Sequence, residues 1–263
     1  MFKVYNLSQN ENSHKLELDL KVFKFPAGEV HFNLDTSLVV DNALHITTDL
    51  SNSDEIIQLM LFADAFRHKD KYLELLYTPY ARQDRRTSHG EPFSLRAFAK
   101  MINSCGFKRV TVYDPHSDVT AALIDNIFVI KRVDLVIKND VFAAGSYGNS
   151  IIISPDVGAL KANQPIAQHY KIPHISATKI RDVETGEITA TKIHTDIDLM
   201  GKDLFILDDI CDGGRTFVEL AKVLKGHKPK TLNLYCTVSI SEKGRHAVRQ
   251  YYDTMTFNHE LGE

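Results

Sequence analysis

Short apolar runs recur along the chain and predict strands that are buried on both faces. Most of these runs are continuous rather than strictly alternating with polar residues, which is typical of strands in parallel sheets. The predicted strands are 37–40 (SLVV), 73–77 (LELLY), 109–113 (RVTVY), 127–130 (IFVI), 151–153 (III), 203–207 (DLFIL) and 231–238 (TLNLYCTV).

Amphipathic runs lie between these strands and indicate helices that pack on a sheet. They follow Ser53, Ser94 and Gly214, and glycines at 106 and 226 stand where the second and third helices are expected to end. The three apolar stripes consist of Ile57, Met60, Leu61 and Ala65; of Leu95, Phe98, Ala99 and Ile102; and of Phe217, Leu220, Ala221 and Leu224.

Alternation of strands and helices along the whole chain predicts an α/β fold with mainly parallel sheets flanked by helices. We expect two such units, at 1–140 and 141–263, with loop-like residues at 138–150 (KNDVFAAGSYGNS) between them. The segment 174–196 is polar and rich in turn residues, and we expect a long mobile hairpin over a site there.

Composition narrows the functional classes. Of the 263 residues, 43% are hydrophobic and 25% are charged, which is the usual mixture of a soluble globular protein and argues against disorder. The formal net charge is −3, from 31 basic and 34 acidic residues. This balance argues against a nucleic-acid coat and against a polybasic membrane surface, so we expect neither partner.

Two further observations point to the cytoplasm. The start of the chain, MFKVYNLSQNENSHK, has no signal-peptide core, and no run reaches the ~18 apolar residues of a spanning helix. Cys105, Cys211 and Cys236 lie far apart and form no CxxC motif, which argues against a disulfide framework and a zinc site. We therefore expect a reduced, cytoplasmic protein.

The segment 204–217 (LFILDDICDGGRTF) carries the sharpest chemical signal. An apolar strand runs into Asp208 and Asp209, and a glycine-containing loop then opens a helix. Such a loop lets backbone N–H groups approach a phosphate, and the helix N-terminus adds partial positive charge. The carboxylates stand at the strand end, where they can bind sugar hydroxyls or a magnesium-bound substrate. A surface Asp pair beside an ordinary glycine turn is the simpler alternative.

This segment resembles the phosphoribosyl-pyrophosphate (PRPP) loop that type I phosphoribosyltransferases share with ribose-phosphate pyrophosphokinases. Four more segments resemble the second family and occur in its order: 25–29 (FPAGE), 79–85 (PYARQDR) with Glu91-Pro92, 110–118 (VTVYDPHSD) and 153–158 (ISPDVG). The resemblance implies two phosphoribosyltransferase-like, Rossmann-like domains. The first would bind ATP, and the second would carry a catalytic flexible loop and the PRPP loop.

The resemblance also implies roles for individual residues. ATP would be held by Phe25, Glu29, Arg82, Gln83, Asp84 and His116. Magnesium, the implied cofactor, would be held by His116 and Asp156, and catalysis would depend on Lys179 and Arg181. Ribose and its 5-phosphate would be held by Asp208, Asp209, Asp212, Gly213, Gly214, Arg215 and Thr216. Standing alone, most of these residues would read as solvated loops or ordinary core positions.

The implied reaction transfers the β,γ-diphosphoryl group of ATP to the C1 hydroxyl of ribose 5-phosphate, giving PRPP and AMP. Three positions depart from the family: Ala27 replaces an Asn or Asp, Gly213 replaces a hydroxyl residue, and Arg215 replaces a small residue. Two alternatives stay open, namely transfer to a larger 5′-substituted ribose such as ADP-ribose in NAD salvage, and a non-catalytic regulatory homologue. Because the family's ATP site draws on two subunits, a homo-oligomer, dimer or hexamer, is expected.

Overall fold

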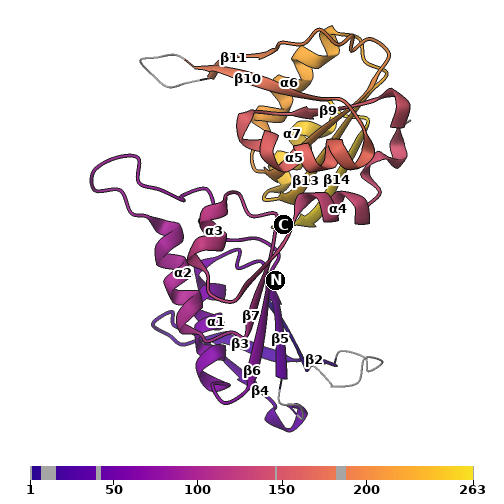
Figure 1. The fold of residues 1–263 in the computed structure, drawn as a ribbon. Helices are drawn as coiled ribbons and strands as arrows, with labels where there is room; N and C mark the ends of the chain where they lie inside the picture. Colours follow the sequence, from indigo (N-terminus) through magenta and orange to yellow (C-terminus); the bar gives the residue numbers. More distant parts are fainter. Residues whose placement is uncertain (1, 7–15, 40–42, 146, 182–187, 263) are drawn as a thin grey trace. The chain divides into compact units, whose positions relative to one another are not determined.

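The computed structural model describes residues 2–6, 16–39, 43–145, 147–181 and 188–262 (Figure 1). The chain divides into two compact units, Met1–Ile130 and Lys131–Glu263, and each unit has its own six-stranded sheet. The segment 131–140, which the sequence pattern assigned to the first domain, folds with the second unit. The reason is that helix α4 (Arg132–Lys138) packs on helix α5 (Val157–Tyr170).

The first unit is a mixed sheet with the strand order β2-β1-β5-β6-β7-β8. Strands β5 to β8 are parallel, whereas β1 is antiparallel to both of its neighbours. The strands are β1 (Phe2–Asn6), β2 (Leu16–Leu18), β5 (Ala43–Thr48), β6 (Asp70–Leu75), β7 (Arg109–Tyr113) and β8 (Ile127–Ile130). A separate antiparallel hairpin joins β3 (Leu20–Lys24) to β4 (Val30–Leu34). The helices are α1 (Ser53–Ala65), α2 (Ser94–Ser104) and α3 (Asp118–Leu123).

Helices α1 and α2 bury apolar residues against this sheet, but only α2 uses the predicted stripe. The predicted residues of α2 are all buried. In α1 the prediction is right only for Met60 and Leu61, which pack partly buried against the core. Ile57 is 45% exposed, and Ile56, Leu59 and Phe62 are buried instead. The helix is apolar on most sides, so its sequence pattern is a weak guide to which side is buried. Phe62 decides it, since its ring packs against those of three other phenylalanines, Phe2, Phe32 and Phe66.

Within the predicted strand 37–40, the described residues 37–39 do not form a strand, and residue 40 lies outside the described residues. The segment begins as a 3-10 helix, η1 (Thr36–Leu38), because the Asp35 carboxylate accepts hydrogen bonds from the backbone N–H of Ser37 at 2.9 Å and from its hydroxyl at 2.6 Å. A short aspartate side chain that binds the backbone two residues on favours a turn over an extended strand.

The second unit has the strand order β11-β10-β9-β12-β13-β14 and is parallel except for the β10–β11 pair. Its strands are β9 (Ser150–Ser154), β10 (His174–Arg181), β11 (Ile188–Ile193), β12 (Asp203–Cys211), β13 (Thr231–Ser239) and β14 (Thr254–Glu260). Its other helices are α6 (Arg215–Gly226) and α7 (Glu242–Arg249), with the short 3-10 helices η2 (Val141–Ala144) and η3 (Tyr147–Asn149).

Both faces of the central strands in this sheet are buried, as their continuous apolar sequences predicted. On one face the stripe of α6 packs in the same core as Leu204 and Ile206, and all four predicted stripe residues are buried. On the other face the ring of Phe205 lies 4.6 Å from that of Phe142, near α5. The predicted fold class is therefore confirmed: the protein is α/β, with two mainly parallel six-stranded sheets flanked by helices.

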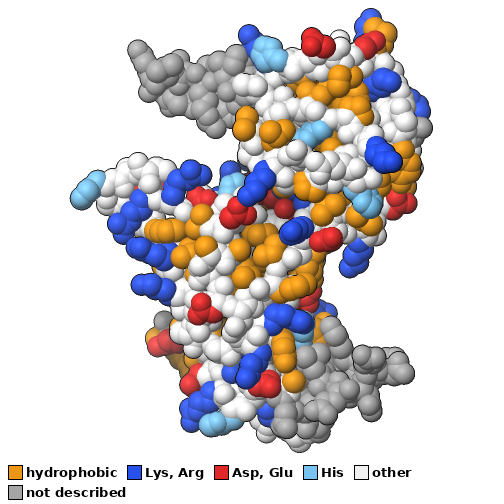
Figure 2. All heavy atoms as spheres, viewed as in Figure 1, with side chains coloured by type: hydrophobic (Ala, Val, Ile, Leu, Met, Phe, Trp, Pro, Cys, Tyr) orange, Lys and Arg blue, Asp and Glu red, His pale blue; other side chains and the backbone are white. Residues whose placement is uncertain are grey.

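On the face drawn in Figure 2, basic, acidic and apolar side chains are interspersed, in keeping with the net charge of −3. Among the helices that the structure describes, none combines the length and the apolar character needed to cross a bilayer.

Candidate active site

Strand β12 carries the aspartate pair to the carboxyl edge of the second sheet. It continues to Cys211, beyond the predicted end at 207, so Asp208 and Asp209 lie inside the strand. The side chain of Asp208 is 17% exposed, and Asp209 is 8% exposed. Because β12 is parallel to both β9 and β13, these carboxylates stand at the edge where open α/β sheets bind ligands.

The loop after β12 turns sharply into α6. Asp212 and Gly213 are exposed, whereas Gly214 is buried, has a φ of +77° and caps α6. A Cβ at 214 would lie 2.9 Å from the carbonyl oxygen of Gly244, so both the φ and the close backbone approach require glycine. Helix α6 then begins at Arg215, and the N–H groups of its first turn have no acceptor within the helix. This arrangement suits an anion.

Residues at the beginning of α7 contact the backbone of this loop. The hydroxyl of Ser241 donates a hydrogen bond to the carbonyl oxygen of Asp212 at 3.2 Å, and the N–H of Ile240 donates to the carbonyl oxygen of Cys211 at 2.8 Å. Gly244 packs so closely that a Cβ there would overlap the Asp212 carbonyl. These supporting residues were missed in the sequence, although Ser241 followed by Gly244 is a detectable helix start.

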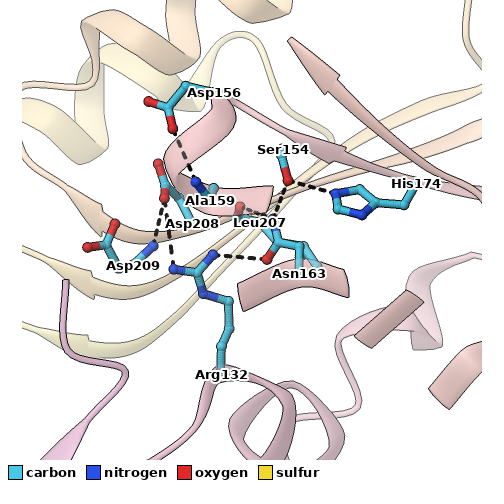
Figure 3. A network of polar contacts seen from close by, with 9 residues as sticks. All are labelled: Arg132, Ser154, Asp156, Ala159, Asn163, His174, Leu207, Asp208 and Asp209. Atoms are coloured by element: carbon cyan, nitrogen blue, oxygen red, sulfur yellow. Dashed lines mark hydrogen bonds and ion pairs between the residues drawn. The ribbon is translucent and has the colours of Figure 1, made fainter. Parts of the chain in front are cut away.

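A buried polar network lies beneath Asp208 (Figure 3). One nitrogen of the Arg132 guanidinium donates to Asn163 Oδ1 at 2.9 Å, and another lies 4.0 Å from Asp208 Oδ1. Asn163 Nδ2 donates to Ser154 Oγ at 2.8 Å and to the carbonyl oxygen of Leu207 at 2.9 Å. Arg132, Asn163 and Ser154 come from α4, α5 and β9, so no local sequence pattern indicated that they meet.

The network extends to a histidine on β10. Ser154 Oγ and His174 Nε2 are hydrogen-bonded at 2.7 Å. Since Ser154 Oγ accepts from Asn163, its own proton is free for His174 Nε2. Burial lowers the pKa of His174, which is consistent with a neutral ring that accepts this proton.

The pKa of Asp208 reflects its burial and its acidic neighbours. Burial raises its pKa well above the ordinary value, and the neighbouring Asp209 raises it further, while Arg132 opposes both. Asp156 adds a weaker repulsion from the end of β9. Such crowding of acids beside a buried cation is common where a protein binds a polar ligand.

Asp156, the predicted magnesium ligand of this unit, is the N-cap of α5. One of its oxygens accepts a hydrogen bond from the N–H of Ala159 at 3.2 Å. His116, the other predicted ligand, belongs to the first unit. Among the residues described, no three histidine, cysteine or acidic side chains come together as a metal site.

The predicted catalytic cations lie on a β-hairpin. Lys179 and Arg181 belong to β10, which pairs with β11 in an antiparallel ladder that aligns Lys179 with Thr191. The segment 174–196 is thus built on two paired strands, and residues 182–187 of the predicted mobile loop lie outside the described residues.

In the first unit, the predicted ATP residues follow two neighbouring strands. The loop after β6 carries Arg82 and Gln83, both exposed, and the loop after β7 carries His116, also exposed. Because β6 and β7 are parallel neighbours, both loops leave the same edge of the sheet.

Asp84 differs from the residues beside it because it points inward. It is 7% exposed and pairs with Arg85 at 3.0 Å. Burial alone would raise the pKa of Asp84, but nearby donors and the charges of Arg85 and His116 outweigh it and lower that pKa. Because the charge of His116 acts on Asp84, the loop after β6 and the loop after β7 lie close together.

The remaining predicted ATP residues, Phe25 and Glu29, form the turn of the β3–β4 hairpin. The N–H of Phe25 donates to the carbonyl oxygen of Glu29 at 2.9 Å, and Gly28 closes the turn with a φ of +97°. Phe25 is 48% exposed, with its ring centroid 5.4 Å from that of Phe23. An exposed ring on a hairpin tip is available for stacking.

Comparisons with known proteins agree across both units. Residues 10–106 match the N-terminal domain of ribose phosphate pyrophosphokinase, and residues 120–262 match the phosphoribosyl transferase domain. The chain resembles the ribose-phosphate pyrophosphokinase of Saccharolobus solfataricus at 30% identity, covering 76% of this chain and 69% of the relative. For that of Campylobacter jejuni the identity is 27%, and the coverage is 84% and 72%.

The fold has a solved counterpart. The crystal structure of phosphoribosylpyrophosphate synthetase from Mycobacterium smegmatis superposes with a TM-score of 0.75 at 18% identity, covering 92% of this chain and 86% of that one. Both domain matches and the identity to curated relatives lead to one conclusion: the chain belongs to the ribose-phosphate pyrophosphokinase (PRPP synthetase) family.

Proposed function

We propose that the protein is a magnesium-dependent ribose-phosphate pyrophosphokinase. In this reaction the C1 hydroxyl of ribose 5-phosphate attacks the β-phosphorus of ATP, the β,γ-diphosphoryl group moves intact, and AMP leaves. The observation that carries the proposal is the aspartate pair on β12, followed at once by the loop at the start of α6. This arrangement supports the proposal, because two carboxylates beside a helix N-terminus would suit the hydroxyls and the phosphate of a phosphorylated sugar.

The acceptor would be bound by the second unit. Asp208 and Asp209 accept hydrogen bonds from the ribose hydroxyls, because carboxylates are strong acceptors for sugar O–H groups. The N–H groups at the start of α6, with the hydroxyl of Thr216, hold the 5-phosphate. Holding the sugar at both ends orients its C1 hydroxyl and reduces the entropy cost of meeting ATP.

ATP would be bound by residues of the first unit. Arg82 offers a planar fork of donors to the phosphates, and Gln83 and His116 add hydrogen bonds. Phe25 would stack on the adenine with Glu29 beside it, while Asp84 orients the loop through its pairing with Arg85. Lys179 and Arg181, on β10 of the second unit, would neutralise charge on the transferring group, which is the protein's main task in phosphoryl transfer.

Magnesium suits a site with few protein ligands. This cation keeps several waters and typically takes one or two carboxylates plus substrate phosphates. The proposed ligands are Asp156, a carboxylate at the start of α5 in the second unit, and His116, an exposed imidazole in the first unit. When bound, magnesium would neutralise the polyphosphate charge.

A mass-resolved assay tests the proposal. The protein is incubated with ATP, magnesium and a panel of sugars, and AMP and the sugar product are identified by mass. Ribose 5-phosphate should give PRPP and stoichiometric AMP. Absence of acceptor-dependent AMP with every sugar would refute an enzymatic function and favour a non-catalytic homologue.

A matched pair of variants tests the catalytic hairpin. Lys179→Ala should abolish turnover without lowering the melting temperature. Lys192→Ala, an exposed lysine on the partner strand β11, is the control and should keep the wild-type rate. Equal rates for both variants would remove Lys179 from the mechanism.

A second acceptor has a specific observation in its favour. Arg215 is exposed at the first position of α6, and nothing lies within 4 Å of a Cβ built at Gly213, so the loop has both a spare cation and room. A guanidinium there suits a second phosphate, as in the diphosphate of ADP-ribose. Competition between ribose 5-phosphate and ADP-ribose would measure the preference, and Arg215→Ala should reduce the use of ADP-ribose more than that of ribose 5-phosphate.

A further inference from the structure

We propose that Arg132 is a positioning residue for the acceptor sugar: its buried guanidinium fixes the Asp208 carboxylate in the orientation that receives the ribose hydroxyls. The inference rests on the proposed function, because it assigns Asp208 to the sugar. Arg132 would act only through Asp208 and would not touch the substrate itself.

The first argument is the burial of a permanent charge. Arg132 is 4% exposed, and a guanidinium stays protonated at any physiological pH. A charge removed from water is tolerated when it has acceptors and a counter-charge. Arg132 has both, since Asn163 Oδ1 accepts from it at 2.9 Å and Asp208 Oδ1 lies 4.0 Å from its other terminal nitrogen.

The second argument is that Asn163 holds the guanidinium in a single direction. Asn163 is fully buried, and both its Nδ2 protons are used, one by Ser154 Oγ and one by the carbonyl oxygen of Leu207. Its amide therefore cannot turn over without losing these bonds. Leu207 immediately precedes Asp208 on β12, so the network holds both the backbone before Asp208 and the cation that faces its side chain (Figure 3).

The third argument is the repulsion that Asp208 meets from other sides. Asp209 on the same strand and Asp156 at the start of α5 both raise the pKa of Asp208 by repulsion. Burial, and to a lesser degree the charge of Asp208, raise the pKa of the Cys236 thiol on β13. Asp208 Oδ1 also accepts the backbone N–H of Asp209 at 2.9 Å. Without Arg132, these acidic neighbours would turn Asp208 away or favour its protonation, and either change weakens a hydroxyl acceptor.

Kinetics separate this role from a purely structural one. Arg132→Met should raise the KM for ribose 5-phosphate about ten-fold or more while the KM for ATP stays within about two-fold. Arg132→Lys keeps the charge and should recover much of that loss. Lys138→Met, at the exposed end of the same helix, is the control and should match the wild type. A lower kcat with unchanged acceptor KM, or no difference between methionine and lysine, would overturn the proposal.

A double-mutant cycle gives a readout that does not need turnover. Melting temperatures are measured for Arg132→Met, Asp208→Asn and the double variant. Because asparagine needs no counter-charge, the double variant should melt above Arg132→Met alone, whereas additive losses would overturn the pairing. If Arg132→Met does not fold, the same cycle is run with Arg132→Lys, and a coupling is again expected. If the wild type forms no acceptor-dependent AMP, the proposed function fails, yet the cycle still decides whether Arg132 and Asp208 act as a pair.

Discussion

Replacing Gly244 by alanine should damage the phosphate-binding loop from a distance. A Cβ at this position would overlap the carbonyl oxygen of Asp212, lie 2.9 Å from its carbonyl carbon and lie 3.2 Å from Ser241 Oγ. Ordinary van der Waals contacts begin near 3.4 Å, and the closest neighbour is backbone rather than the end of a flexible side chain. The loop at 212–214 or the start of α7 therefore has to move.

The size of the effect follows from that displacement. Relieving the overlap requires a shift on the order of 1 Å, and such a misplacement in a binding site costs about 100-fold in rate. Overpacking of this kind also costs about 1–3 kcal/mol of stability. We therefore expect Gly244→Ala to lower kcat/KM for ribose 5-phosphate by about two orders of magnitude and to lower the melting temperature by several degrees.

The assay compares Gly244→Ala with Gly226→Ala. Gly226 ends α6, and a Cβ there meets nothing within 4 Å. This control should keep wild-type activity and stability within about 1 kcal/mol, since alanine suits a helix better than glycine. The reasoning is refuted if Gly244→Ala keeps wild-type kcat/KM. A lower melting temperature with full activity would likewise show that α7 does not position the loop.

Three further substitutions give separable results. The hydrogen bond from His45, assisted by Tyr113 and Thr47, outweighs burial and lowers the pKa of Glu74 to about 2. The ionised Glu74 carboxylate therefore stabilises the folded state above about pH 4.5, and this stabilisation is lost as the pH falls toward 2. Glu74→Gln should therefore cost about 1–3 kcal/mol at pH 7 and little near pH 2 by urea unfolding, and a constant difference would contradict this. Burial lowers the pKa of His174, so the unfolded chain takes up the proton more readily and the free energy of unfolding falls as the pH drops below 6.5. His174→Gln should therefore make the free energy of unfolding less dependent on pH between pH 7 and 5. Phe25→Ala should raise the KM for ATP about ten-fold without changing the melting temperature, because the ring is 48% exposed, and an unchanged KM would remove it from the adenine site.

Local patterns determined the parts of the fold whose cause is local. The runs at 109–113 and 127–130 coincide with β7 and β8, because both are rich in the β-branched and aromatic residues that suit strands. The stripes of α2 and α6 were readable since each has a distinct polar face. The strand–loop–helix unit that begins at 203 was readable too, because its aspartates, glycines and helix start are consecutive in the chain.

Strand β5 (ALHITT) was missed, although its alternating burial is the ordinary pattern of a half-buried strand. The rotation of α1 was predicted incorrectly because that helix is apolar on most sides, and packing of Phe62 determines the buried face. The domain boundary moved because α4 docks on α5, which no composition shift marks.

The surroundings of the candidate site were decided by tertiary structure alone. Asp208 and its loop are visible in the sequence, but Arg132 and Asn163 reach them from helices that are distant in the chain. Gly244 lies against Asp212 only because α7 returns to the end of β12. A sequence motif records which chemical groups are present, whereas the orientation and charge of those groups depend on contacts between segments that fold together from far apart.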